Sequence, residues 1–155
     1  MATIEQRRPD PAVAPADTLT DRHRVAWLLI LSGTLGFSFY VSSQPSPDVS
    51  VIPWVDLLVK KSGHFTGYAL IGGLLATTLW AWAPRVRSLG SAVRTLGSPQ
   101  RLALVLAFLW ASSDEFHQSF SPHRTPAVTD VLLDTCGALV GILIATRIRQ
   151  RWQGR

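Results

Sequence analysis

The stretch VAWLLILSGTLGFSFYV, residues 25–41, contains 17 consecutive residues without a charge. As a helix it would be ~26 Å long, close to the roughly 30 Å hydrocarbon thickness of a bilayer. Three further stretches, 65–84, 102–113 and 135–146, also carry no charge. Charged residues make up only 16% of the 155-residue chain, whereas a soluble domain has roughly 25%. Because a soluble domain this small could not bury four such stretches, the sequence indicates a membrane protein.

We expect an all-α fold, a four-helix transmembrane bundle. The expected spans are residues 25–41, 54–83, 101–120 and 127–146. Pro53 is placed to begin the second helix, because proline is favoured at the first helical position. The expected domain organisation is a disordered cytoplasmic tail at 1–24, a membrane domain at 25–148 and a basic C-terminal tail at 149–155.

Lysine and arginine residues set the expected orientation, since they are enriched in cytoplasmic loops. With four spans, twelve of the fifteen fall on one side, and the other side receives only Lys60, Lys61 and Arg124. We therefore expect a multi-pass protein of the bacterial cytoplasmic membrane with both termini in the cytoplasm and loops 42–53 and 121–126 outside. The net charge of +5 does not indicate a nucleic-acid partner, because the basic residues flank apolar stretches and no nucleic-acid-binding motif accompanies them.

Polar residues collect toward the expected outward ends of the second, third and fourth spans. Their spacing places the members of each span on one helix face, except that Glu115 lies on the flank of its face. They are Lys61, His64 and Tyr68, then Asp114, Glu115, His117 and Gln118, then Asp130 and Asp134. A carboxylate facing lipid at the depth of Asp114 or Asp134 costs several kcal/mol, so these groups must face one another or a water-filled cavity. They are candidate functional residues, together with Arg124 in the loop at 121–126.

One face of the fourth span combines Asp130, Asp134, Gly137 and Gly141 within about 60°. A Gly-xxx-Gly spacing is typical of close helix contacts in membranes, which explains the glycines but not the aspartates. The single cysteine, Cys136, lies in an apolar stretch and has no partner for an intrachain disulfide. We interpret it as a small residue at a helix contact.

The polar cluster has a structural and a functional interpretation. Interhelical pairs, such as Lys61 with Asp130 or Asp134 and Arg124 with Glu115, would stabilise a bundle by about 0.6–2 kcal/mol per contact. The cluster contains more ionisable groups than packing needs, so we favour a polar pocket. Its chemistry stays open at this point between metal binding, acid–base catalysis and simple recognition.

Each of these chemistries would use different members of the cluster. A metal site would draw on two carboxylates with His64 and His117. No HExxH-type pair is present, however, so we assign no metal ligands and no cofactor. For acid–base chemistry the candidate catalytic residues are Asp114, Glu115 and His117. In recognition the carboxylates would hold hydroxyls or amines, and an anionic group would be held by Lys61 and Arg124.

Two segments carry a resemblance to a known family. KSGHFTGYAL at 61–70 is similar to the K-x-x-H-x-x-x-Y signature of the VanZ-like family of bacterial membrane proteins. SDEFHQ at 113–118, P-x-R at 122–124 and D-x-x-x-D-x-x-G-x-x-x-G at 130–141 also resemble that family. The chain differs from the family pattern at Gly67, where family members commonly have a glutamate. The resemblance implies an integral protein of the cell envelope, linked in the family to low-level resistance to teicoplanin-type glycopeptides.

Our leading hypothesis is an envelope protein whose outward pocket binds a polar headgroup or another envelope ligand. The expected partners are membrane lipids, a glycopeptide or a lipid-linked cell-wall precursor. The expected ligand-binding residues are Lys61, His64, Tyr68, Asp114, Glu115, His117, Gln118, Arg124, Asp130 and Asp134. The alternative is an intramembrane hydrolase or transferase acting on a lipid-linked envelope substrate by His/carboxylate acid–base or metal chemistry. A proton-coupled transporter is a third interpretation, disfavoured because four spans show no inverted repeat.

Overall fold

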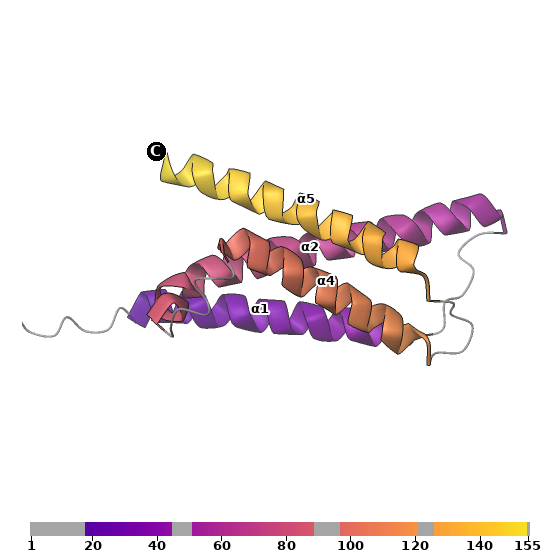
Figure 1. Ribbon diagram of the computed structural model, residues 1–155, viewed down its shortest axis with the longest axis horizontal. Helices are drawn as coiled ribbons and strands as arrows, with labels where there is room; N and C mark the ends of the chain where they lie inside the picture. Colours follow the sequence, from indigo (N-terminus) through magenta and orange to yellow (C-terminus); the bar gives the residue numbers. More distant parts are fainter. Residues whose placement is uncertain (1–17, 45–50, 89–96, 121–125, 155) are drawn as a thin grey trace, which may run out of the picture.

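The computed structural model describes residues 18–44, 51–88, 97–120 and 126–154, and most of these residues are helical. The helices are α1 (Thr18–Ser43), α2 (Pro53–Ser88), α4 (Pro99–Gln118) and α5 (Val128–Gln153). Successive helices run in opposite directions (Figure 1), so α1 and α4 finish where α2 and α5 begin. We refer to this end of the molecule, opposite the start of α1 and the end of α5, as the distal end. The predicted all-α fold is confirmed.

The first and last helices are longer than the expected spans. α1 begins at Thr18 rather than Val25, so the expected N-terminal tail is partly helical. The rest of that tail, 1–17, lies outside the described residues. α5 continues to Gln153 and includes most of the expected C-terminal tail. Arginine is a good helix former, and the first glycine after this stretch is Gly154, so charge alone does not end the helix.

α2 begins at Pro53, as expected, but continues to Ser88. The sequence predicted a loop from Pro84 onward, and this prediction is wrong for the first five residues of that loop. A proline inside a helix removes one backbone donor and tends to kink or break it. At Pro84 the helix continues despite this loss.

Two of the described helices are long and apolar enough to cross a membrane, Asp21–Ser43 within α1 and Val128–Gln153 of α5. α2 and α4 do not meet the same criterion over the residues that were described. Large hydrophobic side chains are nevertheless exposed on all four helices, for example Leu29, Leu70, Leu109 and Leu143. Extensive exposed apolar surface marks a site of interaction, and in helices of this length it is typical of contact with lipid.

α2 is the central helix, and its largest contact is with α5. Gly137 and Gly141 of α5 lie against the backbone of Phe65 and Ala69, so even a methyl group at either glycine would collide with α2. The predicted Gly-xxx-Gly contact surface is therefore confirmed. Cys136 is exposed on α5, so our interpretation of it as a contact residue is wrong. Gly137, the next residue, makes the helix contact instead, since adjacent helical residues face different directions.

α4 packs through a stripe of small side chains. Ala103, Ala107 and Ala111 are spaced four residues apart and are completely buried. Residues at this spacing share one helix face, so the same face reaches Asp114 and Gln118 at the distal end. Close packing of the alanines thereby brings a carboxylate into the interior.

Candidate functional site

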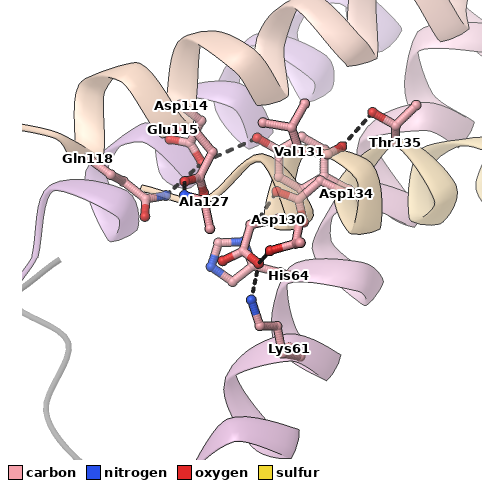
Figure 2. Close-up of polar contacts among 12 residues, drawn as sticks. Lys61, His64, Asp114, Glu115, Gln118, Ala127, Asp130, Val131, Asp134 and Thr135 are labelled. Atoms are coloured by element: carbon pink, nitrogen blue, oxygen red, sulfur yellow. Dashed lines mark hydrogen bonds and ion pairs between the residues drawn. The ribbon is translucent and has the colours of Figure 1, made fainter. Parts of the chain in front are cut away.

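The predicted polar residues converge at the distal end of the bundle. Figure 2 shows Lys61 and His64 of α2 beside Asp130 and Asp134 of α5, with residues of α4 on the adjacent side. The α4 members shown there are Asp114, Glu115 and Gln118. Three helices therefore supply one group of side chains, as the spacing predicted. Arg124, which was also expected here, lies outside the described residues.

Two polar contacts join α2 to α5. Lys61 forms an ion pair with Asp130, and both side chains are partly exposed. One turn further along, His64 Nδ1 lies 3.3 Å from Asp134 Oδ2. The side chain of Asp134 is completely buried. The close approach of the helices at Gly137, one turn beyond Asp134, explains why these contacts are short enough to form.

Asp114 joins α2 to α4. The hydroxyl of Tyr68 donates a hydrogen bond to Asp114 Oδ2 at 3.2 Å, and Gln118 Nε2 donates to the same oxygen at 3.4 Å. Tyr68, Asp114 and Gln118 are all buried. These two donors are neutral, so among the described contacts no cation is paired with Asp114.

Glu115 has a contact that the sequence did not predict. Its Oε2 accepts a hydrogen bond of 2.9 Å from the backbone N–H of Ala127, the residue that precedes α5. The first N–H groups of a helix lack intrahelical partners and carry partial positive charge, which favours a carboxylate there. Glu115 thus fixes the start of α5 against the end of α4.

Three buried carboxylates keep an unused acceptor. Asp114 Oδ1, Glu115 Oε1 and Asp134 Oδ1 have no hydrogen-bond partner within the described part of the chain. A buried polar atom without a partner costs about 1–3 kcal/mol, and more when it is charged. The arrangement can therefore accept hydrogen bonds from a molecule that enters the site.

His117 is turned away from this group toward α1. Its Nε2 lies 3.0 Å from the hydroxyl of Ser43, and its ring stacks on Phe39 with 4.1 Å between the ring centroids. The histidines His64 and His117 therefore contact different helices. Over the described residues, no three His, Cys, Asp or Glu side chains are grouped closely enough to hold a metal ion. The metal site considered from the sequence needs both histidines and two carboxylates together, and the described residues do not form such a group.

A cavity of about 260 Å³ lies beside the polar cluster. Asp114, His64 and Tyr68 line it, and so does a row of α1 hydroxyls, Thr34, Ser38 and Ser42. Sequence reasoning missed the contribution of α1. The available signal was the spacing of the three hydroxyl residues, which places them on one face of an otherwise apolar helix.

Comparison with known proteins gives one family. The family model of VanZ/LLP1 matches residues 13–149, which is most of the chain. No curated protein matches the chain. No solved structure matches it either. The match includes all the residues of the polar cluster and the whole lining of the cavity.

Proposed function

The chain belongs to the VanZ/LLP1 family, and we propose that it is a multi-pass envelope protein whose distal polar cluster binds the polar headgroup of an envelope ligand. The process served by this binding would be low-level resistance to teicoplanin-type glycopeptides, as the family resemblance implies. Lipid headgroups and lipid-linked wall precursors are the ligand classes that this proposal includes.

We infer four membrane spans, with α2 and α4 crossing beside α1 and α5. Both central helices contain a long uncharged stretch, 65–84 in α2 and 102–113 in α4. Both expose large apolar side chains, such as Leu70 and Leu109. Since consecutive helices run in opposite directions (Figure 1), four crossings put both ends of the chain on one side.

The orientation follows from the basic residues. Twelve of the fifteen lysines and arginines belong to the two ends of the chain and to 84–101, whereas Lys60, Lys61 and Arg124 belong to the other side. The positive-inside rule then places the ends of the chain in the cytoplasm. The distal end, with the polar cluster, would face the outside of the cytoplasmic membrane.

The observation that carries the binding proposal is the unused oxygen of Asp114, which is one of three buried carboxylates that keep an unpartnered acceptor. Interhelical pairs that only stabilised the bundle would be expected to satisfy each other, because an unsatisfied buried acceptor is destabilising. Of these three carboxylates Asp114 lines the cavity, so a ligand there that donates hydrogen bonds would satisfy its unused oxygen. The cavity beside Asp114 provides the space for it.

Native mass spectrometry of the full chain in mild detergent tests this proposal. The wild type is expected to carry a bound envelope molecule, and Asp114→Asn is expected to lose it. Ser113→Ala is the matched control, because Ser113 is the exposed neighbour of Asp114 on the same helix. Absence of any bound molecule from the wild type, or equal retention by Asp114→Asn, would contradict the proposal.

An intramembrane hydrolase or transferase is the second candidate, favoured by the His64–Asp134 contact at the edge of the cavity. A histidine oriented by a carboxylate is a common general base. His64→Gln and His117→Gln separate the two candidates. In a binding protein both variants keep part of the affinity for the same molecule, whereas in an enzyme one of them accumulates uncleaved substrate in place of product.

A further inference from the structure

We propose that the cavity between α1, α2 and α4 takes a membrane lipid with a primary ammonium headgroup, which enters sideways from the bilayer and donates hydrogen bonds to Asp114. This inference rests on the proposed function and narrows its ligand to one chemical class. The walls, the opening and the charge of the cavity support it.

The two walls of the cavity are unlike an ordinary helix contact. On α2, Gly63 and Gly67 have nothing within 4 Å of the position that a Cβ would occupy. On α1, Ser38 and Ser42 present small side chains toward the same space. Small residues usually let two helices approach closely, but here they leave an open groove. The groove therefore has room for a narrow chain.

The opening of the groove is apolar. Phe37, Val41 and Leu70 line the cavity and are exposed on the outer surface of the bundle. α1 is also one of the two helices apolar enough to cross a membrane. Side chains of this kind on a membrane helix face hydrocarbon, so a ligand reaching the groove between them arrives from the lipid phase.

The inner end of the groove is acidic. Asp114 is only 5% exposed, and its Oδ1 has no partner within the described residues. The neighbouring lysine and histidine have other partners in the described chain, since Lys61 pairs with Asp130 and His64 contacts Asp134. A buried carboxylate is strongly stabilised by a hydrogen-bonded cation, and a primary ammonium supplies both the charge and the donors.

Ser42 adds a second acceptor on the α1 side. Its hydroxyl is buried and also lacks a partner in the described chain. A primary ammonium has three donors and could use Ser42 as well as Asp114. A quaternary ammonium carries the charge without a donor, and a glycerol headgroup carries donors without the positive charge. The site should therefore bind a primary ammonium headgroup more tightly than a quaternary ammonium or a glycerol headgroup.

The volume of the cavity also limits the ligand. About 260 Å³ lies just below the range of roughly 300–1,000 Å³ typical of small-molecule pockets. A small headgroup with the adjoining part of a chain fits this space. A glycopeptide or a large glycan could not be enclosed by it.

The test uses the full chain in nanodiscs that contain equal amounts of phosphatidylethanolamine, phosphatidylcholine and phosphatidylglycerol. Native mass spectrometry after release from the nanodisc gives the lipids retained by the protein. We expect phosphatidylethanolamine to be retained about tenfold over each of the others, as one charge-assisted hydrogen bond would produce. Asp114→Asn is expected to abolish this preference.

Substitutions in the two walls of the groove test whether the lipid binds there. Gly67→Leu fills the groove and is expected to lose the retained lipid, whereas Gly36→Leu is its matched control. Gly36 also has open space around it, but it lies on α1 outside the cavity lining. Should Gly67→Leu fail to fold, Ser38→Leu blocks the same groove from the α1 wall, with exposed Ser32→Leu as its control.

The outcomes distinguish the two proposals. Retention of another headgroup, lost in Asp114→Asn, would overturn the ammonium inference and leave the proposed function standing. If Gly67→Leu and Ser38→Leu retain the preferred lipid as well as the wild type does, the lipid does not bind in the groove. No preferential retention by the wild type, and no change in Asp114→Asn, would overturn both.

Discussion

The two sides of α2 use the same residue type for opposite purposes. Toward α5, Gly72 and the α5 glycines Gly137 and Gly141 allow backbone to touch backbone, and no side chain would fit. Toward α1, Gly63 and Gly67 adjoin empty space. A glycine in these helices therefore marks either close approach or an opening. Only the position of the neighbouring helix distinguishes the two.

The polar contacts follow the same division. Between α2 and α5, Lys61 and His64 pair with Asp130 and Asp134 across the closed contact. On the other side, Tyr68 reaches Asp114 next to the cavity. We interpret the first set mainly as a connection between helices and the second as the base of a binding site. Four pairs of substitutions test these interpretations of the contacts.

The largest effect is expected from Gly141→Ala. The new methyl group would collide with the backbone of Ala69, and forcing the helices apart should lower the free energy of unfolding by about 1–3 kcal/mol. Gly67→Ala is the matched change on the open side. It should be neutral or stabilising by up to about 1 kcal/mol, because alanine favours a helix more than glycine does. Thermal unfolding in detergent, followed by circular dichroism, measures both, and equal losses would remove the distinction between the two sides.

His64→Leu is expected to have the next largest effect. It would leave the completely buried Asp134 without its described partner, at a cost of about 1–3 kcal/mol. Lys61→Met breaks the neighbouring pair, whose partners are partly exposed, and should cost less than about 1 kcal/mol. The same unfolding assay compares them. A larger loss in Lys61→Met would show that the two contacts have been ranked in the wrong order.

Glu115→Leu tests the attachment of α5 to α4. Removing the acceptor for the Ala127 N–H should destabilise the protein by about 1 kcal/mol, as the loss of a helix cap does. Glu115→Gln retains a carbonyl oxygen and should recover most of this loss. Hydrogen exchange of the first turn of α5 is the suitable measurement. No faster exchange in Glu115→Leu would exclude the proposed attachment.

Tyr68→Phe should lower the free energy of unfolding by about 0.5–1.5 kcal/mol, because it removes one hydrogen bond to Asp114. Tyr40→Phe is the control, since Tyr40 is exposed on α1 and should show no change. Chemical unfolding in detergent would resolve the difference. A loss well above that range would mean that Asp114 is a structural residue first and a ligand acceptor second.

The sequence predicted the positions of the polar side chains better than it predicted their partners. Helical spacing placed Asp114 and Asp134 on inward faces, because the position of a residue around a helix depends only on its number. It did not show that His117 contacts Ser43 and Phe39 on α1. Which helix a face meets depends on packing between distant parts of the chain, and spacing within one helix carries no information about it.

For the fold, too, features within one helix could be predicted, whereas features that depend on packing between helices could not. Uncharged stretches predicted the helices, and the glycines of α5 predicted a close contact that the structure confirms. A polar pocket was expected, but the place of the cavity against α1 could not be predicted, because it results from the separation of α1 and α2 rather than from the composition of either helix. The continuation of α2 beyond Pro84 was also missed, since proline lowers helix stability without always ending a helix.

The proposed function requires the distal end of the bundle to face the outside of the cytoplasmic membrane. Single cysteines in a Cys136→Ser background test this with a membrane-impermeant maleimide on intact cells. Ser119→Cys lies at the distal end of α4 and Gln153→Cys at the opposite end of the bundle, and both positions are exposed. We predict labelling of Ser119→Cys in intact cells and of Gln153→Cys only after permeabilisation. The reverse pattern would place the polar cluster in the cytoplasm and contradict the account.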